Sequence, residues 1–188
     1  ALAIAEQIKV ILTPEEHTRL ATTRQVDPEA YQAYLKGRAL LPKYSLAAYD
    51  EAERQFRRAL EIAPDFAPAW AGLADAAYGR SNMWWAPNDA MPRAREAAQK
   101  ALALDETLAE AHTSLGIVKM AYDWDWAGAE KEFDRAIALR PGSADAHSYR
   151  GRLLMYEGRF DDGLAALRRA LDLDPLSPLY SAFLGWNL

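Results

Sequence analysis

The fold is decided by one stretch, residues 129–175, which reads AEKEFDRAIALRPGSADAHSYRGRLLMYEGRFDDGLAALRRALDLDP. It contains the same spaced pattern twice: a small residue, an apolar residue four positions on, Ala three further, and Pro five further. The two copies are Ala129, Phe133, Ala136 and Pro141, then Gly163, Leu167, Ala170 and Pro175. Residues three and four apart share one face of an α-helix, and proline cannot continue it. The stretch therefore predicts a repeated helical unit.

Two more copies lie upstream. They are Ala52, Phe56, Ala59 and Pro64, and a weaker copy with Ala94, Ala98, Ala101 and Glu106. Successive repeat ends are 34 residues apart from 141 to 175, 35 from 106 to 141, and 42 from 64 to 106. The longest interval indicates an insertion of about eight residues, around 80–92, because such units repeat every ~34 residues. A shorter extension of about three residues falls near 42–46 by the same comparison.

A matching first helix precedes each of these second helices. The fourth copy has His147, Arg150, Gly151 and Leu154, and the third has His112, Leu115, Gly116 and Lys119. This spacing resembles the tetratricopeptide repeat, a helix-turn-helix unit with the consensus W-x2-L-G-x2-Y, then A-x3-F, then P. The resemblance implies an all-α, right-handed α-solenoid over residues 26–188. We place its repeats at about 30–66, 67–108, 109–143 and 144–177, with a half repeat at 178–188, after an N-terminal helical segment at 1–25.

Three longer stretches carry a closer resemblance. They are VDPEAYQAYLKGRALL at 26–41, AEAHTSLGIVKMAYDWDWAGAEKEF at 109–133, and LDPLSPLYSAFLGW at 173–186. They are similar to tetratricopeptide arrays that follow a TolB-like domain in bacterial multidomain regulators. Output modules of that group include winged-helix DNA-binding domains, nucleotide cyclases and kinases. The resemblance implies a protein-interaction scaffold within a larger signalling or transcription-regulating protein, with residues 1–22 as the tail of a preceding domain.

The composition argues against several other functions. The net charge is −5 and the basic residues form no run, so the clustered Lys and Arg that bind nucleic-acid phosphates are missing. The chain has no cysteine, and it lacks the phosphate loop, the HExxH pair and the dinucleotide fingerprint. We therefore expect no enzyme, cofactor, nucleic-acid partner or membrane-inserted helix. His112 and His147 share a repeat position that faces the interior, so we expect core residues and no metal site.

The concave face is the first candidate binding surface. First-helix positions two, five, nine and twelve share one side of each helix. Candidate partner-binding residues at these positions are Tyr31, Tyr34, Arg38, Asp75, Tyr78, Glu110, Met120, Arg152 and Met155. Their aromatic, methionine and charged side chains suit a peptide groove. In the alternative interpretation, the Tyr and Met side chains pack against insertion loops, and the sequence leaves both open.

Chaperone-binding members of this family hold a peptide carboxylate with Lys and Asn at fixed first-helix positions. The corresponding residues here are Tyr34, Arg38, Gly72, Glu110 and Ser114. The chain departs from that clamp almost completely. Recognition of a chaperone carboxyl terminus is therefore not expected.

The insertion is the second candidate surface. Trp84 and Trp85 are adjacent, so their side chains cannot both pack into one core. The repeat pattern does not require Trp124 in the core of the third repeat, so its side chain can contact the insertion or solvent. Exposed Trp side chains often mark interaction hot spots. The alternative is a lid in which the insertion packs on Trp124.

The last helix offers a third possibility, homo-oligomerisation. Leu179, Phe183 and Trp186 would lack a covering second helix, and an uncovered apolar face favours a homodimer. An enzyme is a distant third hypothesis after partner binding and self-association. The compartment is undetermined: the cytoplasm is favoured, and an extracytoplasmic location stays open if the parent protein is membrane-anchored.

Overall fold

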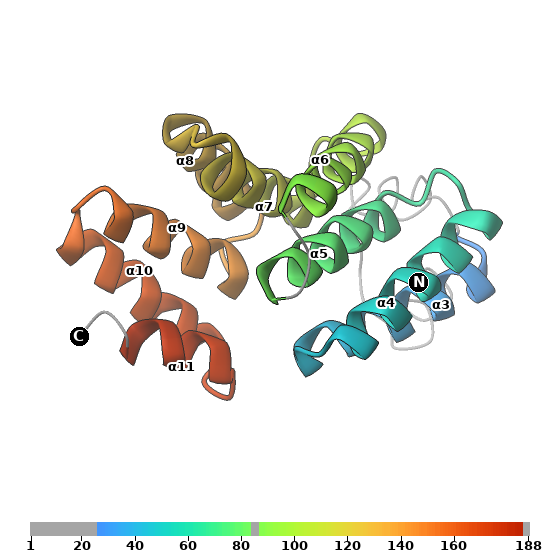
Figure 1. Ribbon diagram of the computed structural model, residues 1–188, viewed down its shortest axis with the longest axis horizontal. Coiled ribbons are helices and arrows are strands. Elements are labelled where there is room, and N and C mark those ends of the chain that lie inside the picture. Colours follow the sequence, from blue (N-terminus) through green and yellow to red (C-terminus); the bar gives the residue numbers. More distant parts are fainter. Residues whose placement is uncertain (1–25, 84–86, 186–188) are drawn as a thin grey trace, which may run out of the picture.

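The computed structural model describes residues 26–83 and 87–185, and in this part the chain forms nine α-helices and no strand (Figure 1). The helices are α3 Pro28–Leu40, α4 Leu46–Ile62, α5 Ala67–Met83, α6 Pro87–Leu104, α7 Ala109–Val118, α8 Trp126–Leu139, α9 Ala144–Tyr156, α10 Phe160–Leu173 and α11 Pro178–Gly185. A 3-10 turn, η1 (Leu41–Lys43), follows α3, and a π-helical turn, η2 (Lys119–Asp123), follows α7. The predicted all-α solenoid is confirmed. The predicted helical segment at 1–25 lies outside the described residues.

Successive helices pair as hairpins, α3 with α4, α5 with α6, α7 with α8, and α9 with α10, and the pairs follow one another along an arc (Figure 1). The second helices carry the apolar stripe that joins the pairs. Phe56 of α4 is fully buried between Gly37 of α3 and Gly72 of α5. A Cβ atom added at Gly37 would lie 2.6 Å from the Phe56 ring, and one at Gly72 would lie 2.5 Å from it. The two glycines therefore let the Phe56 ring pack within its own repeat and against the next.

One ring position ties the first helices α5, α7 and α9 to the chain before them. The Trp70 Nε1–H donates to the Pro64 carbonyl at 2.9 Å, and the Nε2 atoms of His112 and His147 lie 3.0 Å from the carbonyls of Glu106 and Pro141. Because a carbonyl only accepts, each histidine Nε2 donates. These bonds satisfy carbonyl groups in the turns between repeats. The two histidines therefore hold repeat junctions together, at the edge of the packing interior.

His112 also belongs to a charged cluster between α7 and α8. Its Nδ1 lies 2.7 Å from Oε2 of Glu132, and Lys119 Nζ donates to Oε1 of Glu132 at 2.6 Å. Partial burial opposes ionisation of Glu132, but hydrogen bonds from His112 and Lys119 outweigh it and hold the pKa of Glu132 below its ordinary value. The carboxylate thus stabilises the third repeat when ionised.

Replacing Glu132 with glutamine should lower the free energy of unfolding near pH 7 by about 1–3 kcal/mol, because Lys119 and His112 lose the carboxylate that accepts their hydrogen bonds. A depressed folded-state pKa contributes stability above the ordinary carboxyl pKa, and this is lost as pH falls through the folded-state value. The difference between wild type and Glu132→Gln should therefore shrink in acid. Urea unfolding at neutral and acid pH measures it, with Glu96→Gln, an exposed residue of α6, as the control. A difference independent of pH would contradict this role.

The extra residue of the third repeat is absorbed by the π-helical turn η2. A π turn holds one residue more than an α turn, which accounts for the 35-residue interval. Asp123 in this turn forms an ion pair with Arg95 of α6, and the Arg95 guanidinium lies 5.8 Å from the Tyr122 ring. Trp124 follows in the left-handed region, at φ 58°, and is 75% exposed. The π turn that ends the first helix of the third repeat is therefore fastened to the second repeat.

The predicted insertion at 80–92 is helical over most of its length. The α5 helix continues to Met83 and α6 begins at Pro87. Arg80 holds the end of α5 against α4 through ion pairs of 2.8 Å with Asp50 and Glu53. The extra residues therefore lengthen two helices, and residues 84–86, with Trp84 and Trp85, lie outside the described part.

Candidate functional site: a concave cavity

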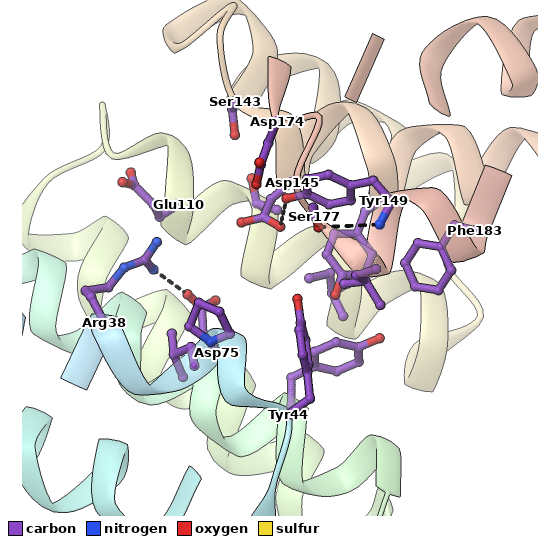
Figure 2. Close-up of a pocket in the computed structure, with 18 of the residues that line it drawn as sticks. Arg38, Tyr44, Asp75, Glu110, Ser143, Asp145, Tyr149, Asp174, Ser177 and Phe183 are labelled. Atoms are coloured by element: carbon purple, nitrogen blue, oxygen red, sulfur yellow. Dashed lines mark hydrogen bonds and ion pairs between the residues drawn. The ribbon is translucent and has the colours of Figure 1, made fainter. Parts of the chain in front are cut away.

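A cavity of about 470 Å³ lies on the concave face of the array (Figure 2). Every first helix contributes to it, and α4 adds the Tyr49 side chain. The first helices supply Arg38, Asp75, Tyr78, Gly79, Glu110, Thr113, Ile117, Asp145 and Tyr149, and α11 supplies Pro178, Leu179, Tyr180 and Phe183. The rim comes from turns: Leu41, Pro42 and Tyr44 on one side, Arg140, Ser143, Asp174, Leu176 and Ser177 on the other. We call this site the concave cavity.

Ion pairs across repeat boundaries line one side of the concave cavity. Arg38 of α3 lies 2.9 Å from Asp75 of α5, and Ser114 of α7 donates to the same carboxylate at 2.7 Å. Arg140 forms a 2.5 Å pair with Oε1 of Glu110, whose Oε2 is buried without a hydrogen-bond partner among the described residues. Burial raises the pKa of Asp75 to about 6, although Arg38 and Ser114 oppose the shift. Three consecutive repeats are thus joined at the site.

Aromatic rings form the opposite wall. Tyr78 and Tyr149 meet edge to face, with ring centroids 5.8 Å apart. The Arg152 guanidinium lies 4.4 Å from the Phe183 ring centroid and 5.3 Å from that of Tyr149. Burial raises the pKa of Tyr149 well above its ordinary value, so this ring stays neutral at physiological pH. A preformed apolar surface with a few polar groups is typical of a binding site.

The rim brings the two ends of the array together. The Tyr44 side chain points into the concave cavity (Figure 2) from a left-handed backbone, with φ and ψ both 45°. On the other side, Tyr180 of α11 donates to Asp145 at 2.6 Å. Burial first, then the charges of Asp145 and Asp174, raises the pKa of Tyr44. Tyr44 therefore lies within electrostatic reach of residues from the last repeat, and the three-residue extension near 42–46 positions it.

The structure brings four of the nine predicted concave-face residues into the cavity: Arg38, Asp75, Tyr78 and Glu110. Arg152 lies behind the aromatic wall, and Met155 packs where a Cβ of Gly163 would stand. Tyr31 is about half exposed and lies beside Tyr34.

Tyr34 is partly buried against the packed interior, and Met120 lies within it. Tyr34 contacts the Phe56 and Phe66 rings, with centroids 6.1 and 5.2 Å away. Met120 is 3% exposed and belongs to the same core cluster as Phe133. It lies in η2, where one inserted residue rotates the following side chains by about 100° around the helix axis. Met120 is therefore covered by its neighbours, whereas Tyr34 keeps part of its surface exposed.

The tryptophan predicted beside the insertion and the residues predicted for self-association lie in different places relative to the concave cavity. Trp124 is exposed beside Trp126, with ring centroids 6.3 Å apart, and does not line the concave cavity. Leu179 and Phe183 do line it, and Phe183 is only 7% exposed, because α11 turns this face toward α9. Phe183 is therefore not an uncovered apolar contact, and Trp186 lies outside the described residues.

Sequence reasoning did not assign Tyr44, Tyr49, Tyr149, Asp174 or Tyr180 to the site. A signal existed for Tyr44, because the extension near 42–46 was recognisable from spacing. The sequence contains no comparable signal for Tyr180 and Asp174, because their approach to Tyr44 depends on the curvature of the whole array.

The stack of helix pairs, the small residues between them and the concave cavity define the class: an α-solenoid of helical-hairpin repeats. The family model described as the tetratricopeptide repeat matches residues 125–178 and again residues 150–186. The chain is a tetratricopeptide-repeat protein, and this fold is generally that of a protein-interaction module. Within the described residues, no helix has the length and apolar character needed to cross a bilayer.

Solved structures share the fold at low identity. Pseudomonas aeruginosa pilF is 20% identical with a TM-score of 0.62, the match covering 88% of this chain and 70% of that one. The thermophilic repeat protein TTC0263 of Thermus thermophilus is 18% identical with a TM-score of 0.57, covering 84% and 98%. The first repeat domain of Spaghetti (RPAP3), solved with the HSP90 peptide SRMEEVD, is 19% identical with a TM-score of 0.53, covering 71% and 97%.

One curated relative matches part of the chain. It is the putative adenylate cyclase 3 of Rhizobium meliloti (strain 1021), 33% identical over 116 residues. The match covers 61% of this chain and 20% of the relative. The chain therefore matches about a fifth of the length of that relative.

Proposed function

We propose that the concave cavity binds an extended segment of a partner protein. The observation that carries this proposal is the cavity itself, about 470 Å³ and lined by every first helix of the array. Helical-repeat proteins present concave surfaces to their partners. The volume lies in the range of preformed ligand sites, roughly 300–1,000 Å³, so it accommodates a few side chains of a peptide.

The larger setting is also a proposal. We place the array in a bacterial multidomain signalling or transcription-regulating protein, where it would recruit a partner to an output domain. Two observations support this placement: the resemblance of residues 26–41, 109–133 and 173–186 to arrays of that group, and the partial match to a putative adenylate cyclase. In this proposal, a partner bound in the concave cavity affects the activity of the output domain through contacts between the two domains or through the chain that links them.

A random heptapeptide library selected against the immobilised chain tests binding. The peptides are displayed inside longer linkers, so that no free terminus is required. We expect a recurring sequence that binds with micromolar affinity and shifts the amide resonances of residues 75–79 and 143–149 in a nitrogen-15 spectrum. If no peptide is enriched, or if the shifts fall on α6, α8 and α10, the concave-cavity proposal is wrong.

A further inference from the structure

The concave cavity carries an excess of negative charge. Four carboxylates line it, on Asp75, Glu110, Asp145 and Asp174, against two guanidinium groups, on Arg38 and Arg140. Both guanidiniums are already paired within the site, with Asp75 and Glu110. Four negative charges and two positive charges leave a net charge of −2 in the cavity.

This excess is concentrated at one end. Among the described residues, the Asp145 carboxylate receives only a neutral hydroxyl, from Tyr180 at 2.6 Å, and the Asp174 carboxylate has no hydrogen bond or ion pair. Figure 2 draws Asp145 and Asp174 on the side of the cavity that α9 and α11 form, and Arg38 on the α3 side, although the charge of Asp145 still reaches Arg38 and helps to raise its pKa. Burial first, and then these two carboxylates, raises the pKa of Tyr44 and of Tyr180, so both rings lie within the field of the carboxylates. Two carboxylates without an ion pair to any described residue thus lie beside two aromatic rings.

The aromatic wall already holds a cation in its other half. The Arg152 guanidinium lies over Phe183 and Tyr149. That positive charge repels a second cation at the Phe183 end, so the Asp145 end is the complementary position. Aromatic faces favour Lys and Arg through cation–π attraction, and their methylene stems pack on ring surfaces.

We infer that the concave cavity recognises a basic side chain of the partner segment, a lysine or arginine whose cationic group lies between Asp145 and Asp174 and whose stem packs on Tyr44 and Tyr180. The inference rests on the proposed function and names the chemistry of the partner. The concave cavity would thus prefer a positively charged group, whereas a carboxylate clamp binds a negatively charged one. An acidic peptide would face uncompensated like charge at this end.

The test compares peptides selected on three forms of the chain: wild type, Asp145→Asn/Asp174→Asn, and Asp161→Asn/Asp172→Asn. The control pair lies on α10, exposed and outside the cavity, and removes the same two charges. Asparagine at 145 can still accept from Tyr180. Circular dichroism and thermal unfolding establish that all three forms fold. Titration with N-acetyl-arginine amide and N-acetyl-norleucine amide, followed by amide shifts, probes the cation subsite directly.

We expect wild type and the α10 control to enrich a Lys or Arg at one fixed peptide position, and the Asp145/Asp174 variant to lose that enrichment. The affinity of a wild-type-selected peptide should fall about tenfold in the variant. N-acetyl-arginine amide should shift residues 44 and 145, and the norleucine probe should not. Peptides that bind the concave face without a basic preference would overturn this inference and leave the proposed function standing. The absence of any concave-face peptide would overturn both.

Discussion

Phe56→Ala should lower the free energy of unfolding by about 3–5 kcal/mol, the range for removing a fully buried aromatic side chain. Phe56 has no exposed surface and fills the space between Gly37 and Gly72. It therefore links α3, α4 and α5, and its loss opens a void at a repeat boundary. Urea unfolding followed by circular dichroism measures the change.

The same contact predicts coupling between Phe56 and Gly72. In the wild type, Gly72→Ala should cost about 1–3 kcal/mol, because the new methyl group would stand 2.5 Å from the Phe56 ring. In the Phe56→Ala background the methyl group enters the void, so the same substitution should cost little or stabilise. Gly142→Ala is the control, since its Cβ would meet nothing within 4 Å. Additive effects of the two substitutions would show that the ring does not set the repeat spacing.

Tyr44→Asn should weaken binding of a concave-face peptide about tenfold or more while leaving stability nearly unchanged. An aromatic side chain in a binding pocket commonly contributes at hot-spot level. Asparagine removes the ring but tolerates the left-handed backbone that Tyr44 adopts at φ 45°. Fluorescence anisotropy with a labelled selected peptide gives the affinity, and thermal unfolding gives the stability.

Trp124→Asn is the matched control for Tyr44→Asn. Trp124 is the other non-glycine residue with positive φ in the described part, and it also lies between the two helices of its repeat. It is exposed outside the concave cavity, so its replacement should leave peptide affinity unchanged. The reverse result, loss of binding with Trp124→Asn alone, would favour the surface beside the 80–92 insertion.

The packing of the repeats was predictable because it depends on local spacing. The positions of Phe56 and Gly116 follow from helical periodicity, and the aromatic rings of Phe56 and Phe133 pack against small residues of the facing helices. The extra residue of the third repeat was also countable from the sequence. Its conversion into a π turn was not, because the same count allows a longer loop, and the pairing of Asp123 with Arg95 depends on tertiary contact.

The candidate site was only partly predictable for a related reason. Arg38, Asp75 and Glu110 lie on the concave side of regular helices, so helix geometry alone located them. Tyr34 packs partly against Phe66, which belongs to the turn between two repeats. Tyr44 and Tyr180 are 136 residues apart in the chain, and only the accumulated rotation of four repeats places them on one cavity.

Chemical blocking of the concave cavity tests the central claim most directly, and the chain has no native cysteine to interfere. Leu176→Cys places a thiol on the rim, at a position 93% exposed, and Phe160→Cys places one outside the cavity, at a position 60% exposed. Each variant is labelled with a bulky maleimide, and its affinity for a selected peptide is measured before and after labelling. We expect labelling at 176 to weaken binding at least about tenfold and labelling at 160 to have no effect. Equal affinities for all four forms would contradict the assignment of the concave cavity as the partner-binding site.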